Sequence, residues 1–260
     1  MKTTKRIYGI VLVLTCGLAA TLRAQNLYIA SYYNGTIGEY TAAGATVNSD
    51  LISGLQYPNG VVISGNDLFV ANDGGAVNGS GTVGEYATAG GTANATLISA
   101  SNGFVGLALG NSGNDLFVGN YFGGTIGEYT DAGVAVSASL ISGLNRPWGV
   151  AVSGGDVFVN NSGNGTIGEY TTAGGTVNTS LISGLNGHWG IAISGNDIFV
   201  SNSGNGTIGE YTTTGGLVNA DLISGLNDPT GIAIAPAPEP SVVALGGVGS
   251  LVLCVWRRRK

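Results

Sequence analysis

The chain has 260 residues, of which 47 are glycine and only 9% are charged, and this length suffices for one all-β domain. Between residues 25 and 235 there are fourteen carboxylates, and Arg146 is the only Lys or Arg. Nucleic-acid binding needs several cationic side chains against the phosphates, so this composition excludes nucleic acid as a partner. Both cysteines, Cys16 and Cys254, lie near the ends, which excludes disulfides and thiol chemistry from the region between them.

The first 24 residues have the pattern of a secretory signal peptide. Basic residues at positions 2, 5 and 6 precede an apolar run over 8–20, and Ala24 suits a cleavage site. A lipoprotein signal that uses Cys16 is the alternative. In either case we expect the protein to be exported from the cytoplasm.

The next region, residues 25–235, is an internal repeat. The phrase GT[IV]GEY begins at Gly35, Gly81, Gly124, Gly165 and Gly206, with spacings of 41 to 46 residues. This period is typical of a four-stranded propeller blade, whereas the alternative, an open β-solenoid, usually has shorter repeats.

Each repeat contains four strand candidates in a fixed order. The third is the GT[IV]GEY phrase, and the fourth is Leu-Ile-Ser. The first strands are predicted at 61–63, 107–109, 150–152, 191–193 and 232–234, and the second at 27–30, 68–71, 116–119, 157–160 and 198–201. The region begins with a second strand and ends with a lone first strand. We therefore predict an all-β fold, a five-bladed β-propeller that is closed when the last strand joins the first three.

Differences between the repeats indicate a binding face. The loops from each fourth strand to the next first strand vary most, and in a propeller they lie beside the central channel, on the same face as the loops between second and third strands. The candidate ligand-binding residues in these loops are Tyr57, Asn59, Phe104, Arg146, Trp148, His188, Trp189 and Asp228.

Two tryptophans in these loops suggest what the face binds. Trp148 and Trp189 occupy equivalent positions on adjacent blades, and flat apolar rings beside amide and hydroxyl groups suit a sugar ring. The alternative is that both rings fill the channel or pack between blades.

The same region offers little catalytic chemistry. It has one histidine, His188, and no lysine or cysteine that could activate a serine, so we predict no catalytic residue and no cofactor. The repeated glutamates lie on third strands and point away from one another, which disfavours a metal ring, and calcium binding by Asp73 or Asp228 is a weaker alternative. These glutamates are Glu39, Glu85, Glu128, Glu169 and Glu210.

Two phrases resemble known propeller repeats. The segments Pro147 to Val152 and Pro229 to Ile234, with Gly-Thr-Ile-Gly-Glu-Tyr-Thr, are similar to NHL-type and streptogramin-lyase-like repeats. The resemblance implies a blade and leaves open a binding scaffold or an enzyme. Lyase-like chemistry would need histidine and glutamate side chains that act with a metal ion, and this chain has a single histidine.

The C-terminal segment, residues 236–260, has three parts: a Pro-Glu-Pro motif, an apolar run over 241–256 and a basic end. It resembles the PEP-CTERM sorting signal through Pro238, Glu239, Pro240, Arg257, Arg258 and Arg259. The resemblance implies recognition by an exosortase-type membrane enzyme and removal of the tail. The alternative is a permanent membrane anchor.

These patterns together predict an exported protein of the cell surface or extracellular matrix that binds or supports other molecules without catalysis. Its expected partners are the sorting enzyme and an extracellular polysaccharide or envelope protein. A plain matrix component and a streptogramin-lyase-like enzyme are the alternatives.

Overall fold

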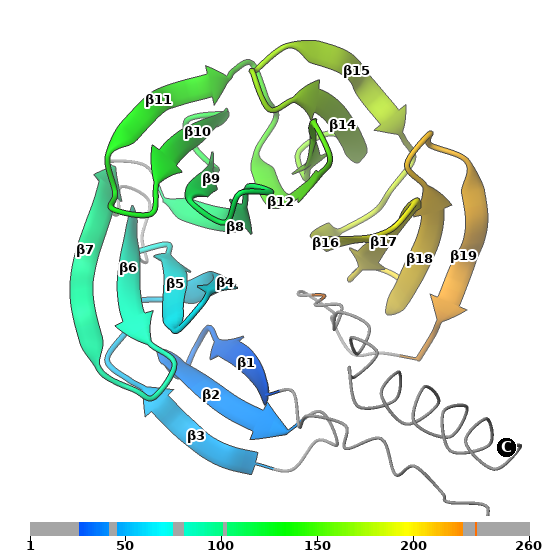
Figure 1. The fold of residues 1–260 in the computed structure, drawn as a ribbon. Helices are drawn as coiled ribbons and strands as arrows, with labels where there is room; N and C mark the ends of the chain where they lie inside the picture. Colours follow the sequence, from blue (N-terminus) through cyan, green and yellow to red (C-terminus); the bar gives the residue numbers. More distant parts are fainter. Residues whose placement is uncertain (1–25, 42–45, 75–80, 101–102, 226–231, 233–260) are drawn as a thin grey trace, which may run out of the picture. The chain divides into compact units, whose positions relative to one another are not determined.

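The repeats fold into five antiparallel sheets arranged in a ring, so the predicted five-bladed β-propeller is confirmed (Figure 1). The computed structural model describes residues 26–41, 46–74, 81–100, 103–225 and 232, and these residues contain strands and turns but no helix. In every described blade the chain runs outward from the ring centre, strand by strand, through tight hairpins.

The strands have nearly the same lengths in every blade. Blade 1 contains β1 (Asn26–Ser31), β2 (Thr36–Thr41) and β3 (Thr46–Ile52). Blade 2 contains β4 (Pro58–Ser64), β5 (Asp67–Asn72), β6 (Gly81–Ala87) and β7 (Thr92–Ala100). Blade 3 contains β8 (Phe104–Leu109), β9 (Asp115–Asn120), β10 (Thr125–Thr130) and β11 (Ala135–Ile141). Blade 4 contains β12 (Pro147–Ser153), β13 (Asp156–Asn161), β14 (Thr166–Thr171) and β15 (Thr176–Ile182). Blade 5 contains β16 (His188–Ser194), β17 (Asp197–Asn202), β18 (Thr207–Thr212) and β19 (Leu217–Ile223).

The hydrophobic core lies between neighbouring blades. Successive residues of a strand point to opposite faces of its sheet, so each middle strand supplies two interfaces. In β13, Val157 and Val159 pack against side chains of blade 3, whereas Phe158 packs against blade 5. The same alternation repeats around the ring, which explains why these strands are apolar on both faces.

The inner strands begin three residues earlier than predicted. They were predicted to start at positions such as Val61 and Val150, but β4 begins at Pro58 and β12 at Pro147. Proline is accepted there because the first residue of a strand can do without a ladder N–H. Residues predicted to lie in loops therefore lie at the inner edge of the sheets, beside the ring centre.

Blade 1 has three strands among the described residues. The strand predicted to complete it, 232–234, lies outside them except for Ile232, which is partly buried. The predicted signal peptide and the Pro-Glu-Pro segment also lie outside them. Within the described ranges, no helix is both long enough and apolar enough to span a membrane.

Candidate functional site

Two residues on the ring face have an unusual backbone conformation. Tyr57 and Arg146 both have a φ of 54° and are the only described non-glycine residues with positive φ. They occupy equivalent positions in the loops before β4 and β12, and Gly187 holds the same place before β16 with a φ of 62°. This left-handed region is strained for residues that carry a Cβ, and such strain gathers at functional sites. The face therefore has a tyrosine and an arginine at positions where glycine would adopt the same φ without strain.

Backbone hydrogen bonds hold the loop that carries Arg146. The carbonyl oxygen of Arg146 accepts from the N–H of Ser162 at 3.1 Å and from its hydroxyl at 2.8 Å. One residue earlier, the N–H of Asn145 donates to the side-chain oxygen of Asn161 at 3.2 Å. The N–H of Leu144 donates to the carbonyl of Gly124, in the preceding blade, at 3.0 Å. The loop is thus tied to blades 3 and 4 at once.

A β-bulge directs the side chain of Trp148. Pro147 pairs with Asn161 and Val150 pairs with Val159, so two residues of β12, Trp148 and Gly149, stand opposite the single residue Asn160 of β13. Such an extra residue bends the strand and changes the direction of the neighbouring side chain. The bulge was not predicted from the sequence, and it recurs in the other described inner strands.

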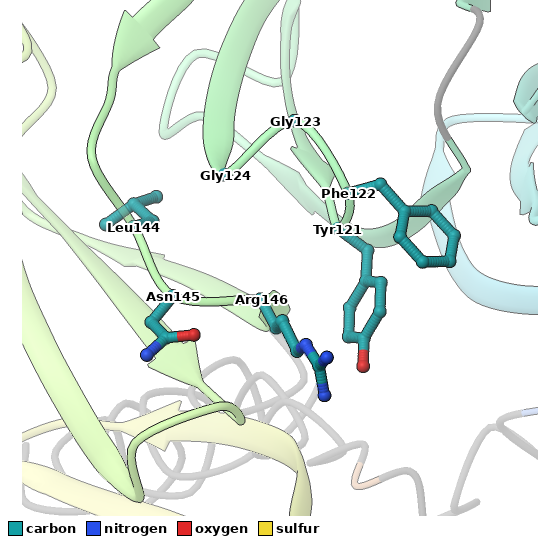
Figure 2. Close-up of a pocket in the computed structure, with 7 residues that line it drawn as sticks. All are labelled: Tyr121, Phe122, Gly123, Gly124, Leu144, Asn145 and Arg146. Atoms are coloured by element: carbon teal, nitrogen blue, oxygen red, sulfur yellow. The ribbon is translucent and has the colours of Figure 1, made fainter.

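Aromatic rings from blades 3 and 4 meet above this bulge. The Tyr121 ring lies edge-on to the Trp148 ring, with centroids 5.4 Å apart, and edge-on to the Phe122 ring at 4.9 Å. The guanidinium carbon of Arg146 lies 6.0 Å from the centre of the Tyr121 ring. Figure 2 shows the Arg146 and Tyr121 side chains extending side by side, with Phe122 beyond Tyr121.

A hollow of about 390 Å³ opens between the two loops that carry these side chains. Its lining residues are Tyr121, Phe122, Gly123, Gly124, Leu144, Asn145 and Arg146. We call this group, together with Trp148, the aromatic hollow. Its size suits a small ring with polar substituents, and it combines ring surfaces, an amide and a guanidinium.

The charge of the hollow is unlike that of the rest of the ring. Arg146 is the only Lys or Arg among the described residues, and no carboxylate of those residues forms an ion pair with it. Its guanidinium, which carries five N–H donors, lines the hollow and lies over the Tyr121 ring. An acceptor-rich ligand, with hydroxyl or carboxylate oxygens, would find its donors here.

The structure brings together only some of the predicted site residues. Arg146 lines the hollow, and Trp148 contacts its Tyr121 ring. Tyr57 lies instead at the boundary of blades 1 and 2, where Asn59 donates to its carbonyl at 3.5 Å. The side chains of His188 and Trp189, and Asp228 altogether, lie outside what the structure describes. The predicted pairing of two tryptophans therefore remains a prediction.

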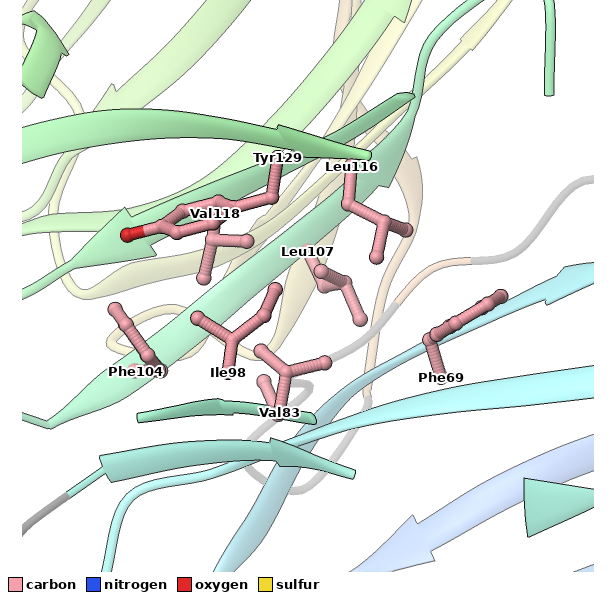
Figure 3. Close-up of a cluster of buried hydrophobic side chains, with 9 residues drawn as sticks. Phe69, Val83, Ile98, Phe104, Leu107, Leu116, Val118 and Tyr129 are labelled. Carbon is pink, nitrogen blue, oxygen red and sulfur yellow. The ribbon is translucent and has the colours of Figure 1, made fainter. Parts of the chain in front are cut away.

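Phe104 was placed wrongly by sequence analysis. It is 2% exposed and belongs to the core between blades 2 and 3, packed with Ile98, Val118 and other apolar side chains (Figure 3). It starts β8 at the position that Pro58 and Pro147 hold in other blades, and those prolines are buried too. Phe104 therefore stabilises the blade interface and cannot contact a ligand on the face.

Tyr121 and Phe122 were missed as site residues. They replace the Ser-Gly found at 162–163 and 203–204 in blades 4 and 5, so the signal was present as a local departure from the repeat. Their pairing with Trp148 could not be foreseen, because it depends on how blades 3 and 4 pack.

Behind the bulge lies a buried polar side chain with no partner. Asn160 is fully buried, and neither its amide nitrogen nor its amide oxygen has a hydrogen-bond partner. At the equivalent place in blade 5, the Ser201 hydroxyl oxygen accepts from the N–H of Gly190 at 2.7 Å. Burying an amide without hydrogen-bond partners costs free energy, so Asn160 destabilises β13 where it lies opposite Trp148.

Replacing Asn160 with serine should therefore stabilise the protein. Serine removes both unpaired amide atoms and can accept a hydrogen bond from the bulge, as Ser201 does, so we expect the free energy of unfolding to rise by about 1 kcal/mol. Urea unfolding followed by circular dichroism measures the change. Ser201→Ala is the matched control with the opposite sign, and a loss of stability in Asn160→Ser would contradict the argument.

The repeated glutamates do not gather at one site. Each lies on a third strand, and Glu39 accepts hydrogen bonds from Asn26 at 2.6 Å and Tyr28 at 3.4 Å. Partial burial, and then the negative charge of Asp115, raises the pKa of Glu128, and burial and the charge of Asp156 raise the pKa of Glu169 in the same way. Among the described residues, no three His, Cys, Asp or Glu side chains come close enough to hold a metal ion.

Comparison with solved structures gives several proteins of similar fold. A catalytically inactive variant of virginiamycin B lyase from Staphylococcus aureus, solved with quinupristin, is 18% identical with a TM-score of 0.61, covering 81% of this chain and 71% of that chain. A streptogramin B lyase is 20% identical with a TM-score of 0.60, covering 80% and 69%. An auxiliary nutrient binding protein from Bacteroides ovatus is 16% identical with a TM-score of 0.62, covering 80% and 60%.

These likenesses show a β-propeller. At identities of 20% or less they show the fold and leave the activity open. No family model and no curated protein matches the sequence.

Proposed function

We propose that this propeller is a non-catalytic binding protein whose aromatic hollow binds a sugar unit of an extracellular polysaccharide. The observation that carries the proposal is the meeting of Tyr121, Phe122 and Trp148 with Arg146 at one blade boundary. A sugar ring has apolar C–H faces that stack on aromatic rings, and its rim of hydroxyl groups accepts hydrogen bonds from a guanidinium.

The charge of the protein narrows the class of polysaccharide. Fourteen carboxylates between residues 25 and 235 oppose one cation, so the field of the ring repels a densely charged polyanion. Arg146 can still pair with a single carboxylate that enters the hollow. The ligand that fits both conditions is a neutral polysaccharide or one with widely spaced acidic sugars.

We further propose that the protein is exported and sorted to the cell surface. The support is the signal-peptide pattern of residues 1–24 and the likeness of residues 236–260 to a PEP-CTERM signal. An exosortase-type enzyme would be the partner for the tail. Mass spectrometry of the protein recovered from the host tests both processing events, because each shortens the chain by a defined segment.

Replacing Trp148 with alanine should weaken sugar binding about tenfold, which corresponds to about 1.4 kcal/mol, because the Trp148 ring supports the Tyr121 ring that lines the hollow. Titration calorimetry of the full-length protein with oligosaccharides from the host's polysaccharide measures the affinity. Val177→Ala, on the exposed outer strand β15, is the control and should bind like the unaltered protein. Equal affinity of Trp148→Ala and the unaltered protein would exclude the hollow as the sugar site.

A lyase is the second candidate, because two of the similar solved structures are lyases of this fold. The chain offers His188 as its single histidine, so such an activity would have to rely on it. Incubating the protein with quinupristin and following the compound by mass spectrometry distinguishes the candidates. Conversion that is lost in His188→Ala would favour the lyase, and an unchanged compound favours the binding protein.

A further inference from the structure

A second aromatic group lies on the boundary of blades 1 and 2. The Tyr32 ring is edge-on to the Tyr33 ring, with centroids 5.0 Å apart and an interplanar angle of 85°, and tilted by 46° against the Tyr57 ring at 4.8 Å. Tyr32 and Tyr33 come from the loop between β1 and β2, and Tyr57 comes from the loop before β4. We call these three residues, with Asp73, the tyrosine cluster.

The tyrosine cluster exposes ring surface that the fold does not require. Tyr33 is 91% exposed and Tyr57 is 39% exposed. Tyr57 also holds its left-handed backbone at φ 54°, although Gly187 fills the equivalent place in blade 5 with a relaxed conformation. Neither burial nor backbone geometry explains why a tyrosine stands there, which indicates a role for its ring.

A carboxylate completes the cluster. Asp73 accepts a hydrogen bond from the Tyr32 hydroxyl at 3.4 Å, and its N–H donates to the Tyr57 carbonyl at 3.1 Å. No lysine or arginine is available to it, since the only one among the described residues, Arg146, lies against Tyr121. The cluster therefore joins three electron-rich rings to a negative charge that no described cation balances.

This combination selects positive charge. The faces of phenol rings carry negative potential and attract ammonium groups, and a neighbouring carboxylate strengthens the attraction. We propose that the tyrosine cluster is a second binding site that takes an organic cation, a protonated or N-methylated ammonium group. Tyr33 and Tyr57 supply the ring faces, Tyr32 packs between them, and Asp73 supplies the counter-charge.

The tyrosine cluster and the aromatic hollow occupy equivalent loop positions on different blades, but their side chains differ. Tyr32 and Tyr33 occupy the loop positions that Tyr121 and Phe122 occupy in blade 3. Tyr57 stands where blade 4 has Arg146, with the same φ. The two sites differ at four equivalent positions, where the tyrosine cluster has Tyr57, Asn59, Tyr33 and Asp73 in place of Arg146, Trp148, Phe122 and Ser162. The loss of the guanidinium and the gain of the Asp73 carboxylate change the expected preference from acceptor groups to cations. The two sites are separate and do not depend on each other.

Calorimetric titration of the full-length protein with choline tests the proposal. Its matched control is 3,3-dimethyl-1-butanol, which has the same shape without the charge. We expect choline to bind at least tenfold more tightly than the neutral alcohol, because the attraction is electrostatic. No binding of choline, or equal binding of both compounds, would overturn the proposal.

Two variants assign the binding to these residues. Tyr57→Gly removes one ring and relaxes the backbone, so it should fold with an unchanged or higher melting temperature and lose choline binding at least tenfold. Asp73→Asn should also weaken binding several-fold. Asp50→Asn, the same change on the exposed outer strand β3, is the control for net charge. If Asp50→Asn weakens binding as much as Asp73→Asn, the effect is one of bulk charge and the site is refuted.

The ammonium group can be a free solute or part of a lipid headgroup. Sedimentation with phosphatidylcholine vesicles separates these sources. Choline binding without sedimentation assigns the site to a soluble ligand, whereas sedimentation that Tyr57→Gly abolishes assigns it to a headgroup. Vesicle binding that Tyr57→Gly leaves intact, in a protein that does not bind free choline, would overturn the proposal.

Discussion

Replacing Gly106 with alanine is expected to lower the free energy of unfolding by about 3 kcal/mol. Gly106 lies in the inner strand β8, where the inner strands of neighbouring blades approach one another most closely. A Cβ at this position would overlap the carbonyl oxygen of Trp148 and lie 3.0 Å from the side chain of Val150. The overlapped atom is backbone, so no rotamer change can relieve the clash. Strands β8 and β12 would have to move apart.

Denaturant unfolding of three alanine variants checks this expectation. Gly155 is the matched control, because a Cβ there meets nothing within 4 Å, so Gly155→Ala should be neutral or slightly stabilising. Gly60, at the equivalent position of blade 2, would place its Cβ 2.9 Å from the Val105 carbonyl oxygen and should give an intermediate loss. Similar stabilities for the Gly106 and Gly155 variants would show that the inner strands are not tightly packed.

Deleting residues 229–235 is expected to abolish the single cooperative thermal transition of the ring. Blade 1 has three strands among the described residues, whereas each of the other four has four. The deleted segment is the one predicted to supply the missing inner strand, next to β1. Without it, the edge of β1 and the apolar flanks of blades 1 and 5 would be exposed to water, which removes the stabilisation that ring closure provides.

Differential scanning calorimetry of the deletion variant measures the effect. A variant that lacks residues 241–260 is the control, because it is shortened by a longer segment that lies beyond the predicted strand. We expect this control to retain one sharp transition. An equally sharp transition after deletion of 229–235 would mean that the ring does not need this segment.

Much of the fold could be predicted from the repeat itself. The period of 41 to 46 residues, the GT[IV]GEY phrase and the apolar runs of the second strands correspond to observed strands such as β13 and β14. The side chains of the second strands point alternately toward the two neighbouring blades. These strands are therefore apolar on both faces, which makes them easy to recognise in the sequence. The inner strands were placed less well, because a bulge breaks the alternation at Trp148 and Gly149.

The candidate site was predicted in part for a related reason. The position of Arg146 and Trp148 on the ring face follows from the order of strands within one blade. Their contact with Tyr121 joins two blades, and the burial of Phe104 depends on the facing blade as well. Such contacts depend on the packing of blades, which the pattern of a single repeat does not contain.

Tyr57 and Arg146 occupy equivalent positions in the loops before β4 and β12, and this equivalence has a consequence for how such a ring diversifies. In four blades the carbonyl at this position accepts a hydrogen bond from the N–H after the second strand: Tyr57 from Asp73, Gly103 from Tyr121, Arg146 from Ser162 and Gly187 from Ser203. These bonds use only the main chain, so tyrosine, arginine and glycine can all stand at this position. After duplication of a blade, a single codon change at this position can alter the side chain that the blade presents on this face, while these main-chain hydrogen bonds stay the same. The ring is in this sense a modular array whose blades share one main-chain frame and differ in the side chains that they present on this face.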